Sequence, residues 1–249
     1  MEVEYVGNNI NEELNFPGAG EIISSAMDLG NLGVIAPHKA KYYDRYNMQW
    51  LESMVDSGEK LKFVTFWKAD AGYENNWLSQ WYQGKPFIIN GRKYYTAEQY
   101  MMAEKALMFN DFDKYARIMQ AKDPGKCKSI GREKIPGFDG KAWGRASREV
   151  IFHGNLGKIQ ADIKLVNALL STENAILVEA SPLDRLYGAG LAKDDLLNAD
   201  GTLKVHPRDW HTTTEPDKQA ENKLGFVWMG IRDLFRDLMK MEKGERYLE

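Results

Sequence analysis

Cysteine is almost absent from this sequence, since Cys127 is the only one in 249 residues. A single thiol excludes internal disulfides and any cluster of thiolate metal ligands. A chain without disulfides is typical of a reducing compartment. We therefore expect the protein to be cytoplasmic.

Long apolar runs are missing as well. No stretch approaches the roughly 18 apolar residues that a membrane-spanning helix needs. The first residues, "MEVEYVGNNINEEL", are acidic and lack the basic and apolar regions of a secretory signal. We therefore expect no membrane partner.

Histidine is also scarce, and the 33 Lys and Arg residues do not outnumber the 36 Asp and Glu residues. None of the four histidines lies in a zinc motif such as H-E-x-x-H. His206 and His211 lie close together in "HPRDWH", but no third ligand accompanies them, so we predict no metal and no cofactor. The formal net charge of −3 excludes a surface coated in positive charge for phosphate backbones, so nucleic acid would be bound locally. The basic stretch at 122–134, "KDPGKCKSIGREK", favours a solvated loop and helix face.

The composition itself is that of a globular protein, with 43% hydrophobic and 28% charged residues. We expect residues 62–249 to form the main domain and residues 1–61 to pack on it. The glycine-rich stretch at 16–33 follows no clear strand and lacks the dinucleotide-binding spacing, so loop and helix-cap glycines are favoured there.

Hydrophobic periodicity predicts an α+β fold that is predominantly α-helical, with a few short strands. Strands are expected at 62–68 and 175–181, and Asn90-Gly91 predicts a hairpin within 86–95. The polar segment 192–221 has no sustained period, and a loop of that length is usually functional or mobile. Helices are expected at 41–58, closed by Gly58, then from Thr96 as N-cap, at 111–122, 139–160 and 162–171, and from Leu224 to Leu238.

The stretch "YTAEQYMMAEKALMF" at 95–109 places Glu98 and Lys105 among the methionines and aromatic residues of an apolar helix. At about 100° per residue, Glu98 and Lys105 lie on one face within roughly 60° of Met102. They are about 10 Å apart along the axis, too far for an i, i+4 ion pair and suited to a sugar-sized ligand between them. The alternative is a lysine that lays its methylenes on apolar surface and extends its amine into water. A buried amine would instead have a lowered pKa and attack carbonyl carbons, with Glu98 moving protons.

This stretch resembles the signature of the NADAR family, and six further motifs follow the family order. The resemblance covers roughly residues 62–236. The other motifs are "FW" at 66–67, "LSQWY" at 78–82, "AKDPGKCKSIGRE" at 121–133 with Trp143, "LLST" at 169–172, "LVEASPLDRLYGAGL" at 177–191 and "NKLGFVWMGIRDLF" at 222–235.

The resemblance implies an N-glycosidase that cuts the C1–N bond of a phosphorylated ribose. Family members act either on riboflavin-pathway ribosylamine intermediates or on guanine in DNA that carries ADP-ribose. The implied catalytic residue is Lys105, which would form a Schiff base with C1 of the ring-opened ribose. Glu98 would then be the nearby acid or base.

Chemistry suggests roles for the other residues in these motifs. Arg132 offers a forked donor for phosphate, although it is also consistent with an ordinary surface arginine. Trp81, Trp143 and Tyr187 can stack on a base, although Trp143 at helical spacing also suits a core position. Ser79 of "LSQWY" is assigned to substrate binding with them.

The motif after the second predicted strand supplies further polar candidates. Glu179 and Asp184 flank "ASPL", and Asp184 can bind ribose hydroxyls or cap a turn. Gly188 and Gly190 allow a ligand to approach the backbone. Asn222 precedes the last helix, where it can act as an N-cap and bind substrate.

The chain departs from the family pattern at two positions. The family often has Trp where Tyr187 stands and Asn where Gln80 stands. We expect these positions to face the base, so the departures concern the leaving group rather than the lysine. ADP-ribosylated guanine, as nucleotide or in DNA, is favoured as substrate, and a phosphorylated ribosylamine metabolite is the alternative. A non-catalytic module that binds ADP-ribose or NAD, and a structural protein with solvated charges on this helix, are the rivals from other classes.

Overall fold

The computed structural model describes residues 42–242, so the glycine-rich stretch at 16–33 lies outside the described residues. Helices dominate and four short strands accompany them within the described range, which confirms the α+β, predominantly helical prediction. The elements in chain order are α3 (Met48–Asp56), β1 (Phe63–Phe66), η3 (Asn76–Leu78), β2 (Phe87–Ile89), β3 (Arg92–Tyr94), α4 (Ala97–Met108), α5 (Phe112–Gln120), α6 (Pro124–Arg132), α7 (Gly140–Gln160), α8 (Ile163–Ser171), β4 (Ile176–Glu179), α9 (Lys193–Leu196), η4 (Pro207–Asp209) and α10 (Lys223–Glu242).

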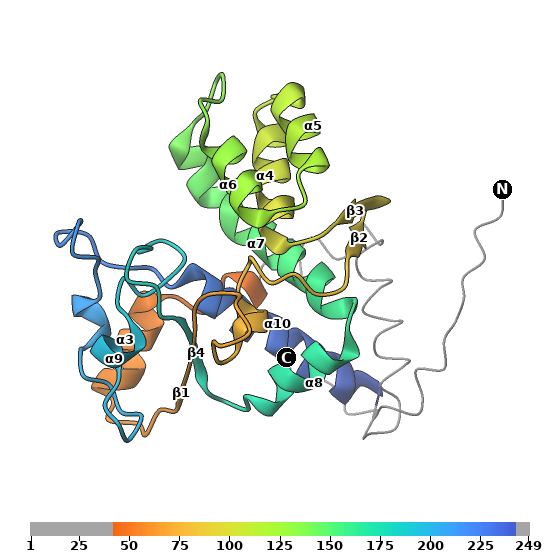
Figure 1. The fold of residues 1–249 in the computed structure, drawn as a ribbon. Coiled ribbons are helices and arrows are strands. Elements are labelled where there is room, and N and C mark those ends of the chain that lie inside the picture. Colours follow the sequence, from red (N-terminus) through yellow and green to blue (C-terminus); the bar gives the residue numbers. More distant parts are fainter. Residues whose placement is uncertain (1–41, 243–249) are drawn as a thin grey trace.

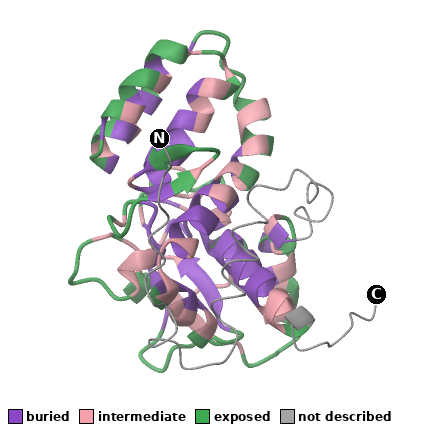
Figure 2. Ribbon diagram, turned by 90° about the vertical axis from the view of Figure 1, so that its right-hand side faces the viewer, coloured by how far each residue is buried: buried purple, intermediate pink, exposed green. Residues whose placement is uncertain are grey.

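Two strands far apart in the chain form a parallel pair at the centre of the fold. The register runs from Phe63 opposite Ile176 to Phe66 opposite Glu179. The two strands lie within the ranges predicted for them, 62–68 and 175–181. α10 packs against β4 and α7, and the middle of the molecule is its most buried part (Figure 2). The pair therefore fixes Glu179, the last residue of β4, at the edge of the core.

The hairpin prediction is confirmed. β2 and β3 pair antiparallel, and the turn between them consists of Asn90 and Gly91. Their φ angles are 51° and 73°, the left-handed values that this dipeptide favours. The turn brings the chain back directly before α4.

α4 begins where Thr96 was predicted to cap it. The Thr96 hydroxyl accepts a hydrogen bond from the Gln99 N–H at 3.1 Å. The return bond of the capping box differs from the usual pattern, because the Gln99 side chain accepts from the Tyr95 N–H instead of the Thr96 N–H. The Gln99 amide also donates to the Ala121 carbonyl at 2.7 Å. One buried glutamine thus joins the start of α4 to the end of α5.

α4, α5 and α6 form a helical layer on one side of the β1–β4 pair, and α7 runs from that layer toward α8 and α10 (Figure 1). α6 was not predicted as a separate helix. Asp123 caps it and Pro124 occupies its first turn, which are ordinary helix-start signals. The basic stretch 122–134 is therefore mostly helix, with Cys127 and Ile130 on its buried face.

The segment 192–221 is packed rather than extended into solvent. It contains α9 and η4, and the Trp210 side chain within it is fully buried. His206 and Arg208 both bind the Asp56 carboxylate at the end of α3. α3 itself packs on η4, so residues 42–61 belong to the same body as this segment. The proposed division at residue 61 stays a prediction.

The start of α10 lies against the backbone of β4. A Cβ atom at Gly225 would overlap the Leu177 carbonyl oxygen, a backbone atom that cannot rotate away. We expect Gly225→Ala to lower the free energy of unfolding by about 3 kcal/mol, because overpacking of this kind forces two backbones apart. Gly144→Ala is the matched control, since no atom lies within 4 Å of its added methyl group. Urea unfolding of both variants tests this, and equal stabilities would contradict it.

Candidate functional site

Glu98 and Lys105 of α4 are both partly or wholly removed from water. Glu98 is 3% exposed and Lys105 is half-buried. α4 contacts α5, α6 and α7, which explains why apolar residues surround it on most sides, as predicted. Neither charge is a solvated residue on an ordinary surface helix.

The Lys105 amine lies against a backbone carbonyl and two aromatic rings. Its Nζ donates a hydrogen bond to the Gly131 carbonyl at 2.9 Å. The ring centroids of Phe138 and Trp143 lie 4.9 Å and 6.0 Å from Nζ. Burial lowers the pKa of Lys105, the nearby cations Arg132 and Lys114 lower it further, and Glu98 opposes them. These surroundings favour the neutral amine, which is the nucleophilic form.

The Glu98 carboxyl group is buried and incompletely bound. The Trp81 side chain hydrogen-bonds to it, yet its Oε1 atom has no hydrogen-bond partner among the described atoms. Burial raises the pKa of Glu98, and Asp184 adds to the rise. Lys128 and Arg132 oppose it. A carboxyl group with a raised pKa holds its proton more readily than a solvated glutamate, which suits it to proton transfer.

The segment before the hairpin is held from three helices at once. Its three consecutive carbonyl groups at 78–80 each accept a hydrogen bond from a different helix. The pairs are Leu78 with the Trp228 indole at 2.8 Å, Ser79 with Lys158 Nζ at 2.8 Å, and Gln80 with the Glu98 N–H at 3.0 Å. These three hydrogen bonds fix the backbone at 78–80, and the next side chain, Trp81, stays 38% exposed beside Glu98.

Glu179 is held at the end of β4 with its carboxyl group out of solvent. Its N–H donates to the Asn222 side chain at 3.1 Å. Part of the residue is exposed, but the Oε2 atom is buried and has no partner among the described atoms. Burial raises the pKa of Glu179 to about 8, and Asp184 and Glu98 add to the rise. Lys128 and Lys158 oppose them.

The turn after β4 is built from the side chain of Asp184. Its Oδ1 accepts from the N–H groups of Leu186 and Tyr187, which is the turn-capping role. Asp184 nevertheless acts electrostatically on both Glu98 and Glu179. The turn thus brings a third carboxylate to the first two.

The two glycines of this turn and Asn222 serve the protein's own backbone. A Cβ at Gly188 would meet the Glu179 carbonyl oxygen at 2.8 Å, and one at Gly190 would meet the His211 carbonyl carbon at 2.6 Å. The Asn222 amide donates to the Leu177 carbonyl at 3.0 Å and is fully buried. These three residues shape the turn and the end of β4, and their contact with substrate stays a prediction.

The aromatic residues predicted to stack on a base lie around the same group of charges. The Tyr187 hydroxyl hydrogen-bonds to the Ser147 and Trp143 side chains, and burial raises the pKa of Tyr187. Trp143 is partly buried and also lies over Lys105. Trp81 carries Lys128 over its ring at 5.5 Å from the centroid. The structure therefore brings these rings to the two residues on α4.

The remaining predicted residues divide between the surface and the interior. Arg132 is exposed at the last turn of α6, and it acts electrostatically on both Glu98 and Lys105. Ser79 is buried, and its hydroxyl accepts from the Trp81 N–H. Gln80 is buried too, with its amide nitrogen 3.1 Å from the Met101 sulfur. Ser79 and Gln80 thus support Trp81 from behind.

Three residues of the site were not predicted. Lys128 lies in the basic stretch read as solvated, and its position one turn before Arg132 on α6 was an available signal. Lys158 is fully buried, and its place in the apolar run "NLGKI" is the same anomaly that singled out Lys105. Phe138 is 45% exposed and touches Lys105 from a loop, so no sequence period could have revealed it.

Residues 42–242 lack two features that would indicate other kinds of site. No group of three or more His, Cys, Asp or Glu residues in that range could hold a metal ion. Nor does that part of the chain contain a helix long and apolar enough to cross a membrane.

Comparison with known sequences identifies relatives. Residues 65–236 match the family model described as the NADAR domain. The chain is 34% identical over 160 residues to N-glycosidase R617 of Acanthamoeba polyphaga mimivirus, which covers 63% of this chain and 85% of that protein. It is 32% identical over 143 residues to Protein irg-1 of Caenorhabditis elegans, covering 53% and 67%. A third relative, the chloroplastic riboflavin biosynthesis protein PYRR of Zea mays, is 33% identical over 127 residues, or 49% of this chain and 20% of that protein.

A solved structure supports the same fold. The NMR structure of the Escherichia coli protein YbiA is similar with a TM-score of 0.52, covering 77% of this chain and 92% of that one. The sequences are 21% identical, so this likeness concerns the fold alone.

Proposed function

Because the chain belongs to the NADAR domain family, we propose that it is an N-glycosidase that releases a phosphorylated ribose from a nucleobase-like amine. The name of the mimivirus relative, an N-glycosidase, supports this class of reaction. The observation that carries the proposal is the Lys105 amine, which is half-buried, bound to a backbone carbonyl and under the electrostatic influence of the buried Glu98. A non-catalytic module that binds ADP-ribose has no need of a lysine held in this state.

The proposed reaction proceeds through a Schiff base at Lys105. Opening of the ribose ring breaks the C1–O4 bond, the lone pair of the amine nitrogen forms an iminium bond to C1, and O4 takes up a proton from water. The neutral Lys105 amine adds to C1 and passes a proton to Glu98. The leaving amine gains a proton and departs, which breaks the original C1–N bond. Water then adds to the Lys105 iminium carbon, and the sugar leaves as an aldehyde that closes again to its ring form.

The other residues are suited to binding the two ends of such a substrate. Arg132 is exposed at the end of α6, where its guanidinium can bind a phosphate in bidentate fashion. The exposed rings of Trp81 and Phe138 lie beside Glu98 and Lys105, so each offers a face for a flat base. Stacking of this kind contributes about 1–3 kcal/mol per base.

Within this class we propose ADP-ribosylated guanine, as nucleotide or in DNA, as the substrate. The segment 192–221 borders the turn after β4, where Arg185 binds Glu215 at 2.8 Å and Gly190 contacts His211. The segment 192–221 thus adds a surface beside the site, which suits a leaving group larger than that of a small metabolite. A riboflavin-pathway ribosylaminopyrimidine phosphate is the second candidate, and the match to the maize protein PYRR favours it.

The substrate is tested by offering both compounds to the purified full chain. One is an oligonucleotide with ADP-ribosylated guanine, and the other is the ribosylaminopyrimidine 5′-phosphate. We expect release of ADP-ribose at a kcat/KM at least about tenfold above release of ribose 5-phosphate, about 1.4 kcal/mol in transition-state binding. The reverse ratio would favour the metabolite. Release of neither sugar, with binding of free ADP-ribose retained, would support the non-catalytic module.

A further inference from the structure

Two buried carboxyl groups from different parts of the fold face the same surroundings. Glu98 lies in the first turn of α4, and Glu179 is the last residue of β4. One oxygen of each, Glu98 Oε1 and Glu179 Oε2, is buried without a hydrogen-bond partner among the described atoms. Buried oxygens of this kind are costly unless a ligand or a proton satisfies them.

The ionisation of one carboxyl group affects the other. Glu98 raises the pKa of Glu179, Asp184 raises the pKa of both, and Lys128 lowers the pKa of both. Lys158 acts on Glu179 from the interior. A negative charge on one carboxyl group therefore favours the protonated form of its neighbour.

Their other contacts differ, and this difference decides which carboxyl group is the better acid. Glu98 has the Trp81 side chain as a hydrogen-bond partner, and Arg132 favours its ionised form. Glu179 Oε2 has no hydrogen-bond partner among the described atoms, and desolvation is the main influence on the pKa of Glu179. Glu98 is therefore the better anion and Glu179 the better acid.

We propose that Glu179 is a second catalytic residue, the general acid that protonates the leaving amine while Glu98 acts as the base toward Lys105. This inference rests on the proposed N-glycosidase function. The proton that leaves Glu179 goes to the nitrogen of the departing base as the C1–N bond breaks. Glu98 then releases to solvent water the proton that it took from Lys105, and Glu179 regains a proton from solvent water, so one turnover restores both. The overall change is the addition of one water molecule.

The pH dependence of the rate follows from this division of roles. Burial and the neighbouring carboxylates Asp184 and Glu98 raise the pKa of Glu179 to about 8, against the opposing effect of Lys128 and Lys158. A general acid must be protonated, so kcat should fall as the pH rises above about 8. Glu179→Gln should lower kcat by about 100-fold and abolish this fall, because glutamine has no proton to lose.

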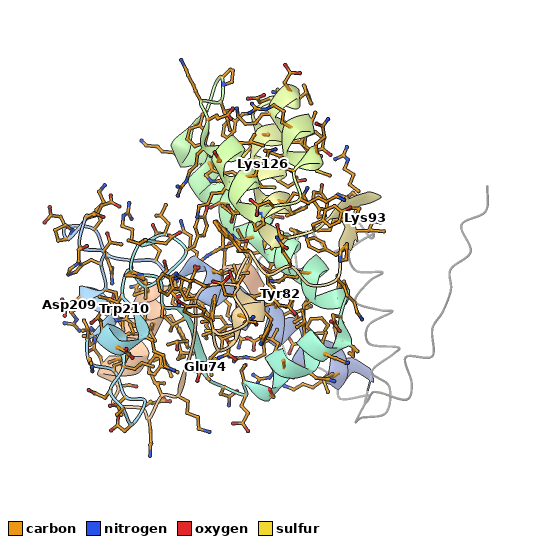
Figure 3. All side chains as sticks on the ribbon, in the orientation of Figure 1. Glu74, Tyr82, Lys93, Lys126, Asp209 and Trp210 are labelled. Atoms are coloured by element: carbon orange, nitrogen blue, oxygen red, sulfur yellow. The ribbon has the colours of Figure 1, made fainter. Side chains whose placement is uncertain are left out.

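The sharpest test varies the leaving group. N-ribosyl arylamine 5′-phosphates with increasingly electron-withdrawing substituents need progressively less protonation to depart. We expect the loss of kcat in Glu179→Gln to be at least about tenfold smaller for the least basic amine than for the most basic one. Glu179→Asp should recover part of the decrease in kcat at alkaline pH. Glu74→Gln is the control, since Glu74 is exposed, pairs with Lys193 and lies among the β1–β4 elements below the α4–α6 layer (Figure 3).

Each outcome bears on the inference separately from the function. Glu179 is not the general acid if Glu179→Gln loses the same fraction of kcat for every amine and keeps the decrease in kcat at alkaline pH. That result would leave the N-glycosidase proposal standing. No sugar release by the wild-type protein from any of these amines would instead overturn the function on which it rests. Retained far-UV circular dichroism and unfolding midpoint in Glu179→Gln would show that the loss of rate is not a loss of fold.

Discussion

Lys105→Ala is expected to lower kcat/KM for sugar release by at least about 1,000-fold, because removal of the nucleophile eliminates the covalent route altogether. The Lys105 side chain contributes one hydrogen bond to a backbone carbonyl and contacts with two rings, so its loss leaves the fold intact. Binding of free ADP-ribose should change by less than about tenfold, since the phosphate and base contacts remain. Initial rates and equilibrium binding measure the two effects separately.

The matched control is Lys93→Ala. Lys93 is an exposed lysine on the β2–β3 hairpin, outside the α4–α6 layer that carries Lys105 (Figure 3). Its removal should leave kcat/KM within about twofold of the wild-type value, as for an ordinary surface substitution. Turnover in Lys105→Ala at more than a tenth of the wild-type rate would remove the amine from the chemistry.

Glu98→Gln is the second large expected effect, with opposite consequences for rate and stability. The variant keeps the shape of the side chain but cannot accept the proton from Lys105, so kcat should fall by about 1,000-fold. Burial raises the pKa of Glu98 above its ordinary value of 4.5, so the ionised carboxylate opposes folding at neutral pH. Removal of that charge should raise the free energy of unfolding by about 1 kcal/mol.

The pH dependence of the free energy of unfolding shows whether the effect comes from the buried charge of Glu98 or from a general change in packing. The stability conferred by Glu98 is fully present below its ordinary pKa and is lost as the pH rises through the raised value. The variant should therefore match the wild type near pH 4 and exceed it progressively toward pH 8. A constant difference across that range, or an unchanged kcat, would contradict the role assigned to Glu98. Urea unfolding at each pH, alongside initial rates, gives both quantities.

Local signals predicted much of the fold. The Asn90-Gly91 turn, the Thr96 cap and the apolar period of α10 each depend on residues close in the chain, and each was found where expected. α6 was missed because its charges suggested solvent, whereas tertiary packing buries Cys127 and Ile130 on its other face. Which face of a charged helix is buried depends on neighbours that the local sequence does not contain.

The candidate site, too, was predicted from the sequence only in part. Periodicity alone placed Glu98 and Lys105 on one face of α4, and the structure buries that face. Periodicity could not show that Lys128 would lie close to both Glu98 and Glu179, because these three residues come from α6, α4 and β4. The parallel pairing of β1 with β4 and the turn capped by Asp184 bring these groups together. Coupling between carboxyl groups is a property of the folded arrangement and of no single motif.

The most direct test of the account is to trap the Schiff base at Lys105. Borohydride added during turnover of the ADP-ribosylated oligonucleotide should reduce the iminium carbon and leave the sugar attached to the protein as a stable secondary amine. Peptide mass spectrometry should then locate the added sugar on Lys105, and the adduct should be absent from Lys105→Ala and present in Lys93→Ala. Turnover without any adduct, or an adduct on another lysine such as Lys128, would contradict the account.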